Sequence, residues 1–201
     1  MTWIKTVAYE DATGRLKMLY DRIKGPDNNV DNIMMSHSLR PHSMDGHMTL
    51  YKYVLHHTGN TVPKWFLEAI GGLVSHLNGC AYCFDHHLTG MARLLKDEAK
   101  SAAIRSAITS GDFASVFDSR EVAALTYARK LTVDPAAMIE QDVLPLRAVG
   151  WEDGEILEIN QVTAYFAYAN RTVLGLGVST QGDIIGLSPN NSDNPDDWSH
   201  T

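Results

Sequence analysis

The residues most able to do chemistry lie in one short stretch, CAYCFDHH at residues 80–87. It holds the only two cysteines of the chain, Cys80 and Cys83, and places His87 four residues after the second. In a helix, side chains at i and i+4 lie on one face, a turn apart. The His87 imidazole could therefore take a proton from the Cys83 thiol or return one. The stretch indicates a thiol redox site.

One acidic residue interrupts the apolar run at residues 65–77, and it is Glu68. A carboxylate buried there needs a polar partner. Glu68 shares a helical face with Gly71, Gly72 and Ser75, and each helical glycine costs roughly 1 kcal/mol relative to alanine. Close approach of another element would justify that cost. We therefore expect the cysteine segment to pack on this face and to meet Glu68.

Helices must position these residues, because no segment shows the period-2 alternation of a strand. Apolar residues recur at helical spacing in eight or nine segments, so the predicted class is all-α. Asn78-Gly79 separates the glutamate segment from the cysteine segment, since glycine commonly closes a helix in the left-handed conformation. The expected helices cover residues 11–23, 31–38, 41–57, 63–77, 80–96, 97–109, 119–131, 141–149 and 155–174.

The composition is that of an ordinary soluble globular protein. The 201 residues, 44% hydrophobic and 20% charged, suit one domain with a terminal extension. The net charge of −7, without a basic block, argues against nucleic acid or an anionic membrane as partner. Neither a transmembrane run nor a secretory signal is evident, so we expect a cytoplasmic protein. A cysteine pair in that reducing compartment is more often catalytic, redox-sensing or metal-binding than structural.

The ends of the chain differ in character. We expect a helical domain over residues 1–180 and a polar, acidic tail over 181–201 that is extended, disordered or laid along a partner subunit. Residues 34–48 are rich in methionine and histidine, which could suit copper. Methionines at helical spacing are more often core filler. Whether residues 34–48 line a channel to the thiols is not decided by the sequence.

The run from Glu68 to His87 resembles the active-site signature of the alkylhydroperoxidase D-like branch of the carboxymuconolactone decarboxylase superfamily. The shared features are the spacing from glutamate to first cysteine, the cysteine pair, and the histidine four residues after the second cysteine. Residues 165–177 are similar to the final-helix pattern of peroxidase-related proteins in that branch. The resemblance implies an all-helical bundle assembled as a homo-oligomer, commonly a trimer or hexamer.

The resemblance also implies a cysteine-based peroxidase that acts on organic hydroperoxides without a cofactor or metal. Cys83 would attack the peroxide, Cys80 would resolve the product, Glu68 would be the base and His87 part of the proton relay. An external dithiol or protein reductant would then reduce the pair. The best-known members carry histidine before the second cysteine, where this chain has Tyr82. A tyrosine, with an ordinary pKa near 10, can pass on a hydrogen bond but cannot act as a base at neutral pH.

Several alternatives remain open at this stage. The helix dipole favours Cys80 as the nucleophile, since Cys80 lies nearest the helix start, whereas the register with His87 favours Cys83. Zinc could bind Cys80, Cys83 and His87 together with Glu68 or His86. The pair could also serve a non-catalytic, redox-sensing helical oligomer. A non-redox lyase, like the decarboxylases of the superfamily, would not need two cysteines.

Overall fold

The computed structural model describes residues 2–200, whose regular structure is helical apart from one isolated bridge between Pro189 and His200. The all-α class is thus confirmed. The helices expected over residues 31–38 and 141–149 are only four and five residues long, because turns follow the first and a 3-10 helix precedes the second. The first helix begins at Gly14 rather than at residue 11. The α-helices of the described residues are α1 (Gly14–Ile23), α2 (Asn32–Met35), α3 (Pro41–His56), α4 (Lys64–Leu77), α5 (Ala81–Leu95), α6 (Glu98–Ser110), α7 (Ser119–Val133), α8 (Leu144–Ala148) and α9 (Asp153–Leu176).

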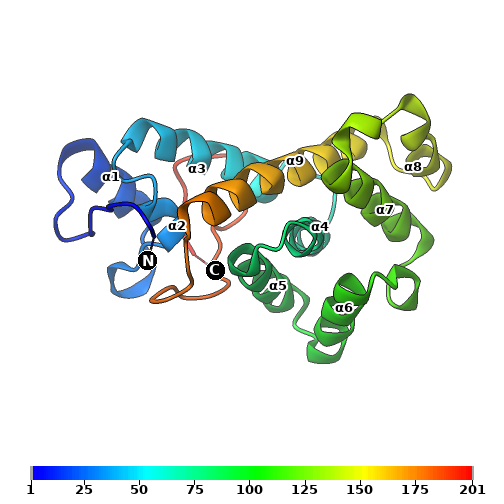
Figure 1. Ribbon diagram of the computed structural model, residues 1–201, viewed down its shortest axis with the longest axis horizontal. Helices are drawn as coiled ribbons and strands as arrows, with labels where there is room; N and C mark the ends of the chain where they lie inside the picture. Colours follow the sequence, from blue (N-terminus) through cyan, green and yellow to red (C-terminus); the bar gives the residue numbers. More distant parts are fainter. Residues whose placement is uncertain (1, 201) are drawn as a thin grey trace.

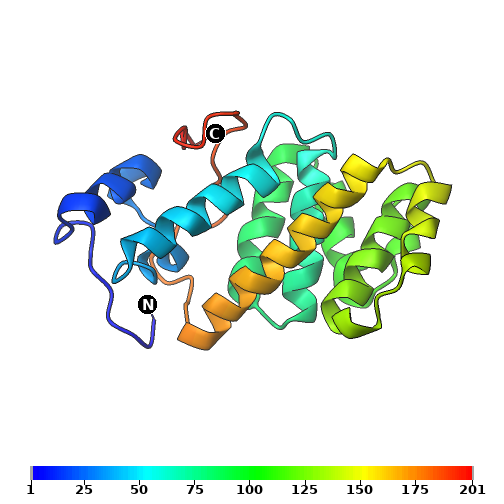
Figure 2. The same cartoon turned by 90° about the horizontal axis from the view of Figure 1, so that it is seen from above.

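Helix α4 is the centre of the molecule. Figure 1 shows it nearly end-on, with α5, α6, α7 and α9 around it. Ten consecutive residues, from Phe66 to Ser75, are buried, as expected for a helix enclosed on all sides. Helices α3 and α9 run side by side across this group (Figure 2). The Glu68 carboxylate is consequently held inside the core.

The two glycines of α4 allow close approach on two sides. A Cβ on Gly72 would lie 2.5 Å from Leu88 Cδ2 of α5, and one on Gly71 would lie 2.2 Å from Phe166 Cε2 of α9. The expectation that the cysteine helix packs on this face is right for Gly72. Gly71 instead makes room for α9. Helix α4 therefore packs tightly between α5, which carries Cys83, and α9.

A tight turn joins α4 to α5. Gly79 has a φ of +70°, and its N–H donates to His76 O at 3.0 Å. The Cys80 N–H donates to Ser75 O at 2.8 Å. These bonds satisfy the last carbonyls of α4 and place Cys80 immediately before α5, at its N-cap. Both sulfurs thus lie near the positive end of the α5 dipole.

The C-terminal segment, residues 179–200, folds back over the helices without regular structure of its own. In Figure 1 its orange-to-red trace lies between the N-terminal helices and α5. Lys52 Nζ donates to Asn190 O at 2.6 Å, His200 Nε2 lies 3.0 Å from Ile23 O, and Trp198 is 5% exposed. The expected tail therefore lies along its own chain here. The domain boundary at residue 180 stays a prediction.

The helices of residues 2–200 include none with the length and hydropathy needed to cross a membrane.

Candidate active site

A cavity of about 60 Å³ lies between α3, α4, α5, α9 and the C-terminal segment. Cys83, Glu68 and His87 all line it. One water needs roughly 10–15 Å³ of such space, so the cavity holds a few waters or the reacting end of a larger substrate. Three of the residues singled out in the sequence thus share one enclosed space.

Glu68 and His87 form a short contact in the cavity. Glu68 Oε2 lies 2.6 Å from His87 Nδ1, and the Glu68 side chain is 1% exposed. A bond this short between a carboxylate and an imidazole is charge-assisted. With Nδ1 engaged, Nε2 is the nitrogen of His87 that remains for proton exchange. The structure brings these two residues together from two different helices.

The two cysteines are buried free thiols, and they differ in acidity. A hydrogen bond from the Cys83 thiol lowers the pKa of Cys80 below its ordinary value. The same bond, together with burial, raises the pKa of Cys83 well above the ordinary value. The neighbouring Asn170 side chain, on α9, acts to lower the pKa of both sulfurs and is itself hydrogen-bonded to Asn78 and Ser75. Cys80 is therefore the more acidic sulfur, whereas Cys83 is the one that shares the cavity with Glu68 and His87.

Tyr82 makes its polar contacts away from the thiols. Its hydroxyl donates to Asp183 Oδ2 at 2.6 Å and accepts from the Ile33 N–H at 3.2 Å. Burial raises the pKa of Tyr82 well above its ordinary value, so the hydroxyl stays protonated as a donor. Among the described residues, no hydrogen bond joins it to a sulfur or to His87. Tyr82 thus lines the cavity, and through Asp183 it also anchors the C-terminal segment.

His56 is a second histidine beside Glu68. It is fully buried at the end of α3, with Nε2 4.0 Å from Glu68 Oε1. Neither ring nitrogen has a hydrogen-bond partner in the described part of the chain. Burial lowers the pKa of His56 well below its ordinary value, so the ring is neutral. A histidine faces each oxygen of the Glu68 carboxylate.

An acidic residue and a histidine form another part of the cavity wall. Asp31 and His86 line the wall, and Asp183 Oδ2 lies 3.5 Å from His86 Nε2. Burial raises the pKa of Asp31 to about 6. Asp183 belongs to the segment without helical periodicity, so nothing in the sequence placed it here. His86 is 7% exposed and lines the cavity.

Aromatic rings form the remaining wall. The Tyr51 ring centroid lies 5.6 Å from that of Tyr165 and 5.9 Å from that of Trp198. Met34 and His47, both from the methionine- and histidine-rich segment, also line the cavity, while the other buried methionines of that segment belong to the core. The segment thus contributes both core and cavity wall.

Within residues 2–200, no group of three or more His, Cys, Asp and Glu side chains is arranged to hold a metal ion.

Solved structures with the same fold include peroxidase-related proteins. One, described as an alkylhydroperoxidase AhpD core from Ralstonia eutropha JMP134, has a TM-score of 0.77 and 18% identity over 89% of this chain and 91% of its own. Another, from Silicibacter sp. TM1040, has a TM-score of 0.68 and 22% identity over 82% and 81%. The debrominase Bmp8, in a variant bound to 2,3,4-tribromopyrrole, has a TM-score of 0.71 and 19% identity over 89% and 91%.

No protein-family model matches the sequence, and no curated protein matches it. At these identities the structural likeness concerns the fold. The chain therefore has the fold of AhpD-like, peroxidase-related proteins, and the resemblance drawn from the cysteine motif is confirmed at that level. The same fold is found in a debrominase.

Proposed function

We propose that this protein is a cysteine-based hydroperoxidase that reduces organic hydroperoxides and is itself reduced by an external dithiol. One observation carries the proposal: Cys83 opens onto the same small cavity as the hydrogen-bonded pair of Glu68 and His87. A thiol of raised pKa needs a base at the moment of reaction, because the thiolate is the nucleophile. The pair supplies that base within an enclosed site.

In the first step, the Cys83 thiol loses its proton to the His87–Glu68 relay. The resulting thiolate attacks the terminal oxygen of ROOH, the O–O bond breaks, and the alkoxide leaves as ROH with a proton returned by the relay. Cys83 becomes a sulfenic acid.

In the second step, the sulfur of Cys80 attacks the sulfenic sulfur of Cys83. A disulfide forms and water leaves, with the proton supplied within the site. The lowered pKa of Cys80 suits this step, since a larger fraction of that thiol is ionised. An external dithiol then returns two electrons and two protons to the pair.

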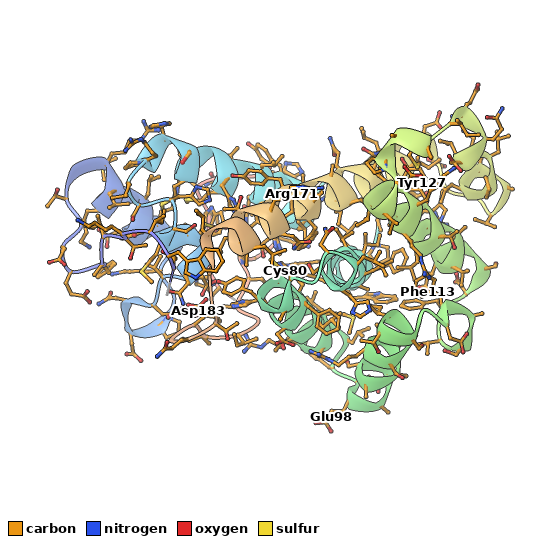
Figure 3. All side chains as sticks on the ribbon, viewed as in Figure 1. Cys80, Glu98, Phe113, Tyr127, Arg171 and Asp183 are labelled. Atoms are coloured by element: carbon orange, nitrogen blue, oxygen red, sulfur yellow. The ribbon has the colours of Figure 1, made fainter. Side chains whose placement is uncertain are left out.

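Consumption of tert-butyl hydroperoxide with dithiothreitol tests the proposal. The Cys83→Ser variant should fall to the rate without protein, because no other thiol faces the relay. Glu68→Gln should lose roughly 10²- to 10⁴-fold in kcat/KM, as removal of a general base does. Glu98→Gln is the matched control, since Glu98 lies on α6 far from Cys80 (Figure 3), and should retain the wild-type rate. Full turnover by Cys83→Ser would refute the proposal, and stoichiometric zinc without turnover would favour a metal-holding protein.

A second candidate is reductive dehalogenation of a small aromatic molecule. The aromatic wall of Tyr51, Tyr165 and Trp198 favours it, and the fold is shared with a debrominase. The same two thiols would supply the electrons: the carbon–bromine bond becomes carbon–hydrogen, bromide leaves, and the disulfide forms. Bromide release from 2,3,4-tribromopyrrole, measured beside peroxide consumption, discriminates between the two reactions.

A further inference from the structure

The tyrosines that line the cavity differ in what their hydroxyls contact. The Tyr82 hydroxyl donates to Asp183 Oδ2, and the Tyr165 hydroxyl lies 3.2 Å from His47 Nε2. The hydroxyl of Tyr51, which lies on α3, has no hydrogen-bond partner among residues 2–200. Because buried polar groups are rarely left without a partner, such a hydroxyl is a candidate to bind a substrate.

The Tyr51 hydroxyl lies among the reacting groups. Burial raises the pKa of Tyr51 well above its ordinary value, and the nearby charges of Glu68 and Cys83 act in the same direction. The hydroxyl therefore keeps its proton at neutral pH. The Tyr51 ring centroid lies 6.2 Å from that of His87. A proton donor thus stands close to both the sulfur and the relay.

Neighbouring rings hold Tyr51 in position. The His56 ring meets it edge-on, with 4.7 Å between the centroids, and the rings of Tyr165 and Trp198 pack against it as described above. Aromatic pairs at such distances favour defined geometries, so the hydroxyl is directed by its surroundings. A phenylalanine at this position would keep the ring contacts and remove only the hydroxyl.

We propose that Tyr51 is a catalytic residue, the general acid that protonates the leaving oxygen of the hydroperoxide. This inference rests on the proposed function. The Cys83 thiolate attacks the terminal oxygen, and a sulfur–oxygen bond forms. As the O–O bond breaks, its electron pair goes to the alkoxy oxygen, which takes the Tyr51 proton and leaves as ROH. The His87–Glu68 relay, which holds the proton from Cys83, then returns that proton to Tyr51.

The task of the relay is thereby divided between two helices. His87, on α5, exchanges its proton at the sulfur, whereas Tyr51, on α3, serves the leaving oxygen. One imidazole would otherwise have to reach both positions within a single step. The raised pKa of Tyr51 does not prevent the transfer, because an alkoxide is a stronger base than a tyrosinate.

The dependence of Cys83 oxidation on the leaving group tests this role. Reduced Cys80→Ser protein, free of dithiothreitol, is mixed rapidly with tert-butyl hydroperoxide or peracetic acid, and loss of the Cys83 thiol is followed by quenched alkylation and mass spectrometry. With tert-butyl hydroperoxide, adding Tyr51→Phe should slow the reaction roughly 10²-fold, at the lower end of general-acid catalysis. With peracetic acid the slowing should stay below about threefold, because acetate is a weak base and leaves without a proton.

Tyr53→Phe, on the same helix but with its ring exposed, is the matched control and should change neither rate. The ratio of the two rates does not depend on the fraction of folded protein, so a packing defect would slow both reactions equally. Equal slowing by Tyr51→Phe, or none, would overturn the role of Tyr51 and leave the proposed function standing. If wild type lacks peroxide turnover, the proposed function and this role fail together.

Discussion

At the scale of single residues, one hydrogen bond gives the two sulfurs different properties. It lowers the pKa of Cys80 and raises that of Cys83. A thiol of lower pKa is more ionised, which suits Cys80 to attack the sulfenic sulfur of Cys83. Such a thiol also leaves more readily when a reductant opens the disulfide. Cys83 depends on the base formed by Glu68 and His87. Cys80 is thus the more acidic cysteine, whereas Cys83 is the one that we propose meets the peroxide.

Asp31 provides a test of the electrostatics of the cavity. Burial raises its pKa from 3.8 to about 6, so the folded protein binds this proton more tightly than the unfolded chain does. The contribution of Asp31 to stability is fully present below pH 4 and is lost as pH rises through 6. Asp31→Asn should therefore be more stable than wild type above pH 7, by up to about 3 kcal/mol, and equal to it near pH 4.

Urea unfolding at pH 4 and pH 7.5 measures this difference. Asp193→Asn, at an exposed position of the C-terminal segment, is the control and should show no pH-dependent gain. A stabilisation of Asp31→Asn that is larger at pH 4 than at pH 7.5 would contradict the assignment.

At the scale of helices, Gly71 and Gly72 determine how closely α9 and α5 approach α4. Gly71→Ala would place a methyl group against the buried Phe166 ring, and we expect a loss of about 1–3 kcal/mol in the free energy of unfolding. Gly46→Ala, inside α3 with open space around it, should instead gain up to about 1 kcal/mol. Urea unfolding compares the two variants; a neutral Gly71→Ala would show that α9 can move away from α4.

The helices were largely predictable because their signals are local. Apolar spacing, Pro63 before α4 and Gly79 after it act within a few residues of where they stand. The approach of the cysteine helix to Glu68 was predicted from the glycine face of α4, whereas the hydrogen bond to His87 in particular was not. That Gly71 faces α9 could not be read from the sequence, because it depends on which long-range neighbour packs there.

At the scale of the whole molecule, the C-terminal segment completes the cavity. Its residues lack any periodicity, so the sequence could give only a polar tail. The structure gives it partners from distant elements, since Asp183 accepts from the Tyr82 hydroxyl and the Asn32 N–H, and Lys52 binds Asn190. In the view of Figure 3, Asp183 lies on the side of Cys80 that faces the N-terminal helices. Such long-range polar contacts leave no local pattern. The trimeric or hexameric state stays a prediction.

Asp183→Ala tests whether the hydrogen bonds of Asp183 hold the C-terminal segment in place. The substitution leaves the Tyr82 hydroxyl and the Asn32 N–H without their acceptor, which costs roughly 1–3 kcal/mol when such groups are buried. We expect faster hydrogen–deuterium exchange across residues 184–200. Asp193→Ala, in the same segment but exposed, should leave exchange unchanged. Equal exchange in wild type and Asp183→Ala would mean that other contacts hold the segment.

The most direct measurement of the central claim is to trap the sulfenic acid after one equivalent of tert-butyl hydroperoxide. Dimedone and mass spectrometry locate it. We expect a dimedone adduct on Cys83 in Cys80→Ser, formed far more slowly when Glu68→Gln is added, and no comparable adduct in Cys83→Ser. Rapid adduct formation on Cys80 in the Cys83→Ser variant, with none on Cys83 in Cys80→Ser, would contradict it.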